Sequence, residues 1–347
     1  MVNCGKSDIT SAQEQPNGYV VVHDPTATTS QVETPWMIVS PDGERGFANY
    51  FTTNAISVVS GDGTNYYAHT ENWGGTSDTH DRTKVIHFTV HDGIPSMHGE
   101  VIDTTNSGET NNVERMKGRT LIAEKGGYLY FYPVRRIGTS LIYNPQTGDA
   151  RTDMSGKPTK SPTEQTCLAV YQDGSNFYFW KRYFVQFYND DFPLELKGLH
   201  RVEGANVLSQ RLCEDEYDFY PTVMTGLPTQ KGGKFYIDMH DKKVLELDVD
   251  REKFLTEGEI STNVVATLPG KISGLSNNGE EVFATSADTN AFYNVTLGQY
   301  NVVKDENGNP KPMVPQTNEG LLRVIDNRKK GGKFLYVTAK GIHSIND

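Results

Sequence analysis

The feature that most restricts the fold of this chain is a turn that recurs along it, followed each time by the same kind of short segment. The turns contain Asp-Gly, Gly-Gly or Asn-Gly, and the segment after each is rich in aromatic and β-branched residues. Such dipeptides supply the positive φ angles of tight hairpin turns, and the following segments have the composition of buried strands. The glycines that mark these turns stand at positions 63, 127, 174, 233, 279 and 332.

The spacing of these turns predicts a repeat. Consecutive marks are 46 to 64 residues apart, and the blades of a β-propeller repeat at about 40–50 residues, with insertions lengthening some of them. A strand-like segment precedes each turn, as at 55–59, 120–123 and 322–325. A further strand-like segment follows the aromatic segment after the turn, as at 85–90, 140–143 and 244–249. A weaker fourth segment follows in most repeats. Four strands per repeat is the composition of a propeller blade, so we predict an all-β fold with six blades.

The two ends of the chain favour a closed ring. The last repeat ends at 341–345 after only three strands, and residues 18–23 form a strand-like segment without a repeat of its own. If that segment completes the last blade, no long sheet edge is left exposed. Residues 32–54 are not placed by a count of six and would supply a seventh blade. We therefore expect a flexible tether over residues 1–17, and one six- or seven-bladed β-propeller over residues 18–347 that is closed by an N-terminal strand.

Composition limits the classes of partner. The formal net charge is −11 over 347 residues, which argues against non-specific binding to nucleic acid or to an anionic membrane surface. The sequence contains no phosphate-binding glycine loop, no Gly-x-Ser-x-Gly elbow and no Rossmann fingerprint. We expect no cofactor, and we expect binding rather than catalysis.

A candidate ligand site follows from the connections between the second and third strands of four consecutive repeats. In a propeller these connections share a face with the loops between blades. Guanidinium groups suit multidentate anions, and aromatic rings offer flat apolar walls and cation–π contacts. The expected ligand is anionic and aromatic, although an anionic glycan, an acidic partner surface or ordinary solvated turn charges are alternatives. The candidate binding residues are Trp73, His80, Arg135, Arg136, Lys181, Arg182, Tyr183, Tyr188 and His240, with Lys242 and Lys243 beside them.

Other polar clusters give weaker signals. His69, His80 and Asp81 could form part of a metal site, whereas the spacing of His87 and His91 is explained more simply by strand pairing. The acidic pairs at 190–191 and 215–216 could serve acid–base chemistry, but they have the pattern of solvated turns. Residues 305–309 lack the ligand spacing of an EF-hand and are predicted to form a turn.

The three cysteines leave their roles open. Cys167 and Cys213 could pair with each other or stay free as buried thiols. Cys4 opens the sequence Cys4-Gly5-Lys6-Ser7-Asp8, which resembles the mature start of a bacterial lipoprotein whose signal peptide has been removed. Asn3 is unusual immediately before a lipidated cysteine, and an ordinary N-terminus with a stray cysteine is the alternative.

The propeller repeat together with this N-terminal sequence resembles the bacterial surface lipoproteins that have propeller folds. Some of these proteins work beside TonB-dependent outer-membrane transporters and capture ferric siderophores or other scarce ligands. The resemblance implies lipidation of Cys4, attachment to the outer membrane on its surface or periplasmic face, a TonB-dependent transporter as partner and a ferric siderophore as ligand. A ferric catecholate is anionic and aromatic, which agrees with the candidate residues.

Two other functions stay open at this point. A propeller enzyme, such as a lactonase or a polysaccharide-cleaving enzyme, would gather residues from several inner strands around a divalent metal. A protein-interaction module would dock an acidic partner through the same basic face. The leading hypothesis is a non-enzymatic, surface-anchored protein that captures an anionic ligand.

Overall fold

The computed structural model of the chain is all-β, and its strands lie in small antiparallel sheets. It describes residues 2–3, 11–23, 36–48, 55–71, 83–92, 94–103, 119–125, 127–133, 141–148, 150–152, 165–170, 176–180, 184–188, 207–211, 224–229, 232–239, 242–250 and 261–345. Within these ranges the single helical element is the 3-10 turn η2 (Arg328–Lys330). In the same residues no helix has the length and apolar character needed to cross a membrane.

The described residues form seven four-stranded sheets and one two-stranded ribbon. The first sheet contains β2 (Ser11–Glu14), β3 (Val20–His23), β4 (Trp36–Val39) and β5 (Gly46–Ala48), and the second contains β6 (Ala55–Val59), β7 (Asn65–Glu71), β8 (Thr83–His91) and β9 (Ile94–Asp103). The third contains β10 (Arg119–Lys125), β11 (Tyr128–Pro133), β12 (Leu141–Tyr143) and β13 (Ala150–Thr152). The fourth contains β14 (Gln165–Val170), β15 (Asn176–Trp180), β16 (Phe184–Tyr188) and β17 (Val207–Arg211).

The remaining elements follow the same plan. Two further sheets contain β18 (Met224–Thr229), β19 (Gly232–Met239), β20 (Lys243–Asp250) and β21 (Ser261–Thr267), and β22 (Gly274–Asn277), β23 (Val282–Ser286), β24 (Ala291–Asn294) and β25 (Gln299–Tyr300). The ribbon consists of β26 (Val302–Lys304) and β27 (Pro310–Pro312). The last sheet contains β28 (Leu321–Asp326), β29 (Phe334–Thr338), β30 (Gly341–Ile345) and the N-terminal strand β1 (Val2–Asn3).

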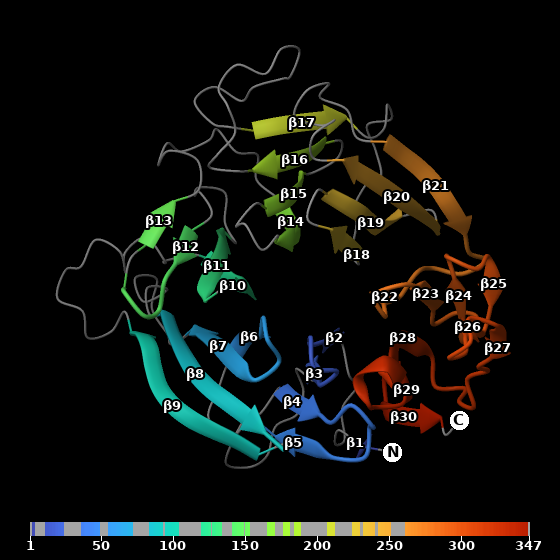
Figure 1. The fold of residues 1–347 in the computed structure, drawn as a ribbon, viewed down its shortest axis with the longest axis horizontal. Helices are drawn as coiled ribbons and strands as arrows, with labels where there is room; N and C mark the ends of the chain where they lie inside the picture. Colours follow the sequence, from blue (N-terminus) through green and yellow to red (C-terminus); the bar gives the residue numbers. More distant parts are fainter. Residues whose placement is uncertain are drawn as a thin grey trace.

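The sheets follow one another around a central opening, with the first strand of each sheet toward the opening and the fourth toward the rim (Figure 1). First strands of neighbouring sheets contact each other in the pairs β6–β10, β10–β14, β14–β18, β18–β22, β22–β28 and β28–β2. This arrangement confirms the prediction of an all-β, propeller-like fold.

The N-terminal residues enter the sheets differently from the prediction. Strand β1 pairs with β30, with Val2 opposite Ile342 and Asn3 opposite Gly341. The segment predicted to complete the last sheet, 18–23, is instead β3, which pairs with β2 and β4 in a sheet of its own. Strands therefore begin before residue 18, within the region expected to be a tether. Residues 36–48, which the count of six blades left over, are β4 and β5 of that same sheet.

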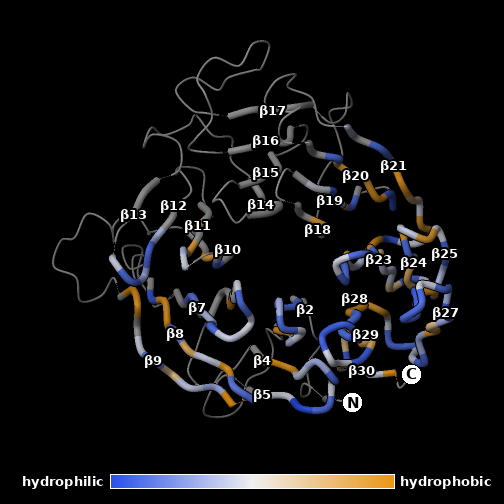
Figure 2. Tube along the Cα trace, viewed as in Figure 1, coloured by the Kyte–Doolittle hydropathy of each residue, from blue (hydrophilic) through white to orange (hydrophobic). Residues whose placement is uncertain are grey.

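The core lies between neighbouring sheets. On β3, Val20 and Val22 pack with Leu335 of the last sheet, whereas Val21 between them packs with Tyr66 of the β6–β9 sheet. Successive side chains of a strand point to opposite faces, so each sheet presents an apolar face to each of its neighbours. Figure 2 shows the resulting hydrophobic segments along the strands, with hydrophilic turns between them.

Four of the seven first strands share an irregularity that the sequence analysis did not predict. In β6, β10, β14 and β28 the register with the second strand skips one residue. An extra residue of this kind is a β-bulge, which bends the strand and increases its twist. The skipped residue is apolar in all four cases, namely Ile56, Ile122, Leu168 and Leu322.

Side-chain hydrogen bonds also join neighbouring sheets at regular sequence separations. Asn17 donates to the carbonyl of Gly63, 46 residues away. Ser276 Oγ donates to the carbonyl of Val324 at 2.5 Å, across 48 residues. Separations close to the interval between the glycine turns are what equivalent positions in adjacent repeats produce, so these bonds support the repeat predicted from sequence.

Candidate functional site

Each four-stranded sheet has two ends that differ in the connections they carry. Because antiparallel strands alternate in direction, the connections from second to third strand leave from the same end as those that lead to the next sheet. We call this the loop end. The glycine-containing turns from first to second strand, and the turns from third to fourth strand, lie at the opposite end, which we call the turn end.

The candidate residues from the sequence fall on second-to-third connections of four consecutive sheets. Strand pairing reaches Glu71 opposite Thr83 and Trp180 opposite Phe184, so these connections begin at the loop end. The connections hold Trp73 and His80 (72–82), Arg135 and Arg136 (134–140), Lys181, Arg182 and Tyr183 (181–183) and His240 (between β19 and β20). These residues, like Cys4, Asp81, Cys213 and the acidic pairs at 190–191 and 215–216, lie outside the described residues.

Tyr188 does not belong to that set. It is the last residue of β16 and pairs with Asn176, the first residue of β15, at the turn end of the sheet. The connection between β15 and β16 is only residues 181–183, because residues 184–188 form the third strand. A strand of this length spans about 13 Å, which separates the Tyr188 backbone from the loop end. The prediction that Tyr188 lies with Lys181 and Arg182 is therefore wrong.

Lys242 already has a structural partner. Its Nζ donates to the carbonyl of Pro269 at 2.8 Å, in the connection between the β18–β21 and β22–β25 sheets. Lys242 itself has a φ of 73° in the turn before β20. Its ammonium group thus joins two neighbouring sheets at the loop end, and it is less available to an anionic ligand than the sequence suggested.

Acidic groups at the loop end of the last sheets are also engaged within the protein. Glu319 accepts a hydrogen bond from Thr338 Oγ1 at 2.9 Å and lies 2.9 Å from His343 Nε2. The hydrogen bond from Thr338 and the neighbouring His343 lower the pKa of Glu319 against the opposing effect of burial. Asp288 likewise accepts from the backbone N–H of Lys271 at 2.8 Å.

His69 is buried near the loop end of β7. Its Nδ1 accepts a hydrogen bond from the backbone N–H of Leu121 in the next sheet, at 3.3 Å. Burial lowers the pKa of His69 to about 4, so the ring is neutral at pH 7. With Nδ1 as acceptor the proton is on Nε2, and no described group accepts from that atom. His69 is therefore a packing residue between sheets, and its expected partners in a metal site lie outside the described residues.

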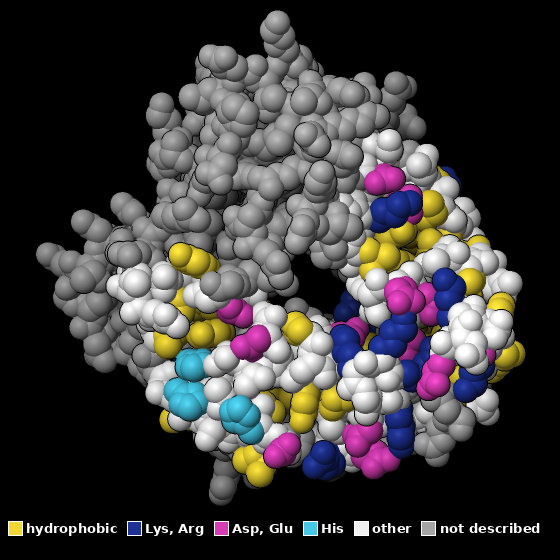
Figure 3. Space-filling view, viewed as in Figure 1, with side chains coloured by type: hydrophobic (Ala, Val, Ile, Leu, Met, Phe, Trp, Pro, Cys, Tyr) yellow, Lys and Arg dark blue, Asp and Glu magenta, His cyan; other side chains and the backbone are white. Residues whose placement is uncertain are grey.

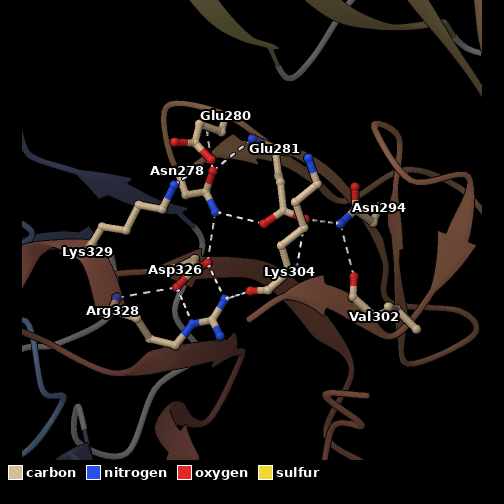
Figure 4. A network of polar contacts seen from close by, with 9 residues as sticks. All are labelled: Asn278, Glu280, Glu281, Asn294, Val302, Lys304, Asp326, Arg328 and Lys329. Atoms are coloured by element: carbon tan, nitrogen blue, oxygen red, sulfur yellow. Dashed lines mark hydrogen bonds and ion pairs between the residues drawn. The ribbon is translucent and has the colours of Figure 1, made fainter. Parts of the chain in front are cut away.

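At the turn end, a buried polar network joins the β22–β25 sheet to the last sheet (Figure 4). Arg328 forms an ion pair with Asp326 through two hydrogen bonds of 2.8 Å each, from Nε and from a terminal nitrogen. Asn278 donates to Asp326 at 2.8 Å and to Glu281 at 3.1 Å. Burial opposes ionisation of Asp326, but the bonds from Arg328 and Asn278 outweigh it and lower the pKa of Asp326.

The same network continues outward through Glu281. Its Oε1 accepts from Asn294 at 2.7 Å and from the backbone N–H of Lys304 at 3.0 Å. Arg328 in turn donates to the carbonyl of Lys304 at 3.0 Å. Buried charges are tolerated only when they are paired and hydrogen-bonded. Because these groups satisfy one another, we assign the network a structural role.

A cavity of about 310 Å³ opens at the turn end between the β6–β9 and β10–β13 sheets. Its polar lining includes Asp62, Asn65, His87, Glu124 and Gln146. Figure 3 shows histidine side chains gathered over β8 and β9, with acidic side chains between them and the central opening. Sequence reasoning missed this cavity, because its lining comes from turns and strands that are far apart in the chain.

Two smaller predictions from the sequence are confirmed. His87 and His91 both lie in β8, so strand geometry accounts for their spacing. Residues 305–309 form the turn between β26 and β27, in which Asp305 accepts from the backbone N–H groups of Asn307 and Asn309.

Comparison with known proteins supports the fold and leaves the function open. No protein-family model matches the chain, and no curated protein matches it. Two structures of the extracellular domain of BT4673 from B. thetaiotaomicron, described as a one-component or a hybrid two-component system, align with TM-scores of 0.53 and 0.55 at 11% and 10% identity. Each alignment covers 98% of this chain and 38% of the BT4673 chain. Apo AztD from Citrobacter koseri aligns with a TM-score of 0.49 at 8% identity, covering 89% of this chain and 88% of AztD.

Proposed function

We propose that this chain is a non-enzymatic, ligand-binding β-propeller that holds an anionic, aromatic ligand of the ferric siderophore type at its loop end. In this proposal the seven four-stranded sheets are the blades, and β1 on β30 closes the ring. The observation that carries the proposal is the position of the candidate residues. They fall on equivalent second-to-third connections of four consecutive sheets, all of which begin at one end.

The residue types fit the ligand class. Arg135, Arg136, Lys181 and Arg182 supply the positive charge that an anionic complex requires, and guanidinium groups can bind two oxygens at once. Trp73 and Tyr183 supply rings for stacking and for contact with flat aromatic ligands. The remaining net charge of the chain is strongly negative, so the basic connections would be a local exception on an acidic surface.

Capture at the cell surface for a TonB-dependent transporter remains part of the proposal, but lipidation of Cys4 conflicts with the closing strand. In a lipoprotein the residues ahead of the lipidated cysteine are removed. Those residues include Val2 and Asn3, which pair with Ile342 and Gly341 in the last sheet. The two states cannot exist in the same molecule. The intact mass of the protein purified from its native membrane fraction distinguishes the two states. Removal of the residues before Cys4 lowers the mass, and acylation of Cys4 raises it by a different amount.

Charge reversal at the loop end tests the ligand site. We expect the full chain to bind a ferric tris-catecholate saturably in a fluorescence titration. We expect Arg135→Glu and Arg182→Glu to weaken this binding by at least about tenfold, since each replaces attraction by repulsion. The matched control is Lys329→Glu at the turn end, an exposed lysine paired with Glu280, which should bind as the unmodified chain does. Equal affinity in all four proteins would show that the site is elsewhere.

A further inference from the structure

The turn-end cavity lies at the opposite end of the sheets from the proposed ligand site. It is formed between two neighbouring sheets, and its volume of about 310 Å³ suits a small molecule. The residues that line it come from β7, β8, β9 and β10 and from three turns. A site here would be chemically independent of the basic connections at the loop end.

Among the described residues that line the cavity, the two charged ones, Asp62 and Glu124, are acidic, and none is a lysine or an arginine. Burial opposes the ionised form of Asp62, but hydrogen bonds from Asn65 and Thr64 outweigh this effect and lower the pKa of its carboxyl group. Asp62 therefore keeps its charge well below neutral pH. An anionic ligand is disfavoured at this site, and a cationic one is favoured.

Glu124 is the more unusual of the two carboxylates. The residue is only 8% exposed, and a single hydrogen bond to its carboxylate is found within the described residues, from the backbone N–H of Gly127 to Oε1 at 2.9 Å. Its Oε2 lies so close to Gly61 that a Cβ at that position would be only 2.0 Å away. Oε2 receives no hydrogen bond within the described residues, and a ligand that brings a positively charged donor into the cavity would pair with this carboxylate.

The neighbouring groups are acceptors as well. The amide of Asn65 donates to Asp62 Oδ2 at 2.6 Å, so its Oδ1 is the atom that meets His87 Nε2 at 2.9 Å. His87 must then donate from Nε2. Burial and the nearby His98 lower the pKa of His87, so the ring is neutral and its Nδ1 is an acceptor. Tyr67 stacks on this ring with centroids 4.9 Å apart.

The described residues do not offer a metal site as an alternative. No group of three histidine, cysteine or acidic side chains among them lies close enough to hold a metal ion.

Two carboxylates, a neutral histidine and two amides in a polar cavity match a ligand that carries an ammonium group and several hydroxyl groups. We propose that the turn-end cavity binds a small polyhydroxylated amine, with the chemistry of an amino sugar, and that Glu124 receives its ammonium group.

Three hexoses of one shape and different charge test this proposal on the full chain. Isothermal titration calorimetry should detect saturable binding of glucosamine, binding of glucose that is about tenfold weaker, and no binding of glucuronate, because only glucosamine offers a charged donor. Glu124→Gln keeps the shape of the side chain and an acceptor for Gly127, and should reduce glucosamine affinity at least about tenfold. Glu280→Gln, which removes an exposed carboxylate at the turn end of another sheet, is the matched control.

The outcomes separate this site from the loop-end site. Glucosamine that binds no better than glucuronate, or that binds Glu124→Gln unchanged, would overturn the proposal. If Glu124→Gln fails to fold, Gln146→Ala on the exposed turn between β12 and β13 replaces it, and undiminished glucosamine affinity in that variant would be equally decisive. Arg135→Glu should leave glucosamine binding intact, and Glu124→Gln should leave ferric catecholate binding intact, so either site can fail without the other.

Discussion

His69 shows how a single buried residue links neighbouring sheets and makes stability depend on pH. It is fully buried, and its Nδ1 is committed to the backbone N–H of Leu121 in the next sheet. In the unfolded chain a histidine binds a proton near pH 6.5, whereas the folded-state pKa is about 4. The unfolded state therefore binds more protons between these values. The stabilisation is complete above about pH 6.5 and is lost as the pH falls toward 4.

We expect His69→Gln to flatten this dependence. Glutamine keeps an acceptor for Leu121 but does not titrate, so the stability lost between pH 6.5 and 4 should shrink by on the order of 3 kcal/mol. Urea unfolding at several pH values measures the difference. The exposed His91→Gln serves as the matched control and should retain the slope of the unmodified chain. The same slope in His69→Gln would show that His69 is not the group responsible.

Asp326 carries the second prediction at this scale. It is 2% exposed and accepts hydrogen bonds from both Arg328 and Asn278. Asp326→Ala leaves a largely buried guanidinium group without its counter-charge, which should lower the free energy of unfolding by about 3–5 kcal/mol. Lys329→Ala removes only an exposed ion pair with Glu280 and should cost a small fraction of that loss. Comparable losses in the two variants in urea unfolding would contradict the structural role of the network.

At the scale of elements, the turns were the most informative part of the sequence. Five of the six marked glycines stand between the first and the second strand of a sheet, and Gly233 is the second residue of β19. Gly63, Gly127 and Gly279 have the positive φ that tight turns need. The seventh sheet was predicted only as an alternative, from residues 32–54, and its strand β3 was assigned elsewhere. Its turn contains Gly18 with a φ of 85°, but the segment after it stands near the N-terminus beside an incomplete last repeat, so it was interpreted as a closing strand.

Glycine also has a role between elements, which Gly332 illustrates. A Cβ on Gly332 would lie 2.4 Å from the carbonyl oxygen of Pro41, in the turn of the neighbouring sheet. Gly332→Ala should therefore cost about 1–3 kcal/mol through a forced shift of the backbone. Gly308 has a φ of 81° with open space around it, and Gly308→Ala should cost about 1 kcal/mol through backbone strain alone. Chemical denaturation compares the two, and a larger loss for Gly308→Ala would contradict the close contact.

At the scale of the whole molecule, the short strand β1 joins the two ends of the chain in one sheet. Without it, the outer edge of β30 would be left unpaired. We expect a chain that begins at Cys4 to lose about 1–2 kcal/mol of stability, in line with the loss of a few backbone hydrogen bonds. Thermal unfolding of the full and shortened chains measures this loss. An unchanged midpoint would show that β1 does not contribute to closure.

The site was less predictable than the fold because it depends on where strands end and which turns meet. Tyr188 was predicted to lie in a loop, because the connection before β16 is only three residues long and the sequence does not show where that strand begins. Lys242 was predicted to be a free cation, although its ammonium group binds the carbonyl of Pro269. The cavity beside Glu124 involves two sheets, and nothing local to Glu124 in the sequence shows that it lines a cavity together with His87 and Asn65. Local sequence patterns identify strands and turns, whereas contacts between sheets depend on how the sheets are arranged around the ring.

The most direct test of the proposed function is thermal unfolding of the full chain with increasing concentrations of a ferric tris-catecholate. A ligand that binds only the folded state raises the unfolding midpoint by mass action. We predict a rise that continues with the logarithm of ligand concentration, and no rise with the iron-free catecholate or with Arg135→Glu. A midpoint that stays constant at all concentrations of the ferric complex would contradict ligand capture at the loop end.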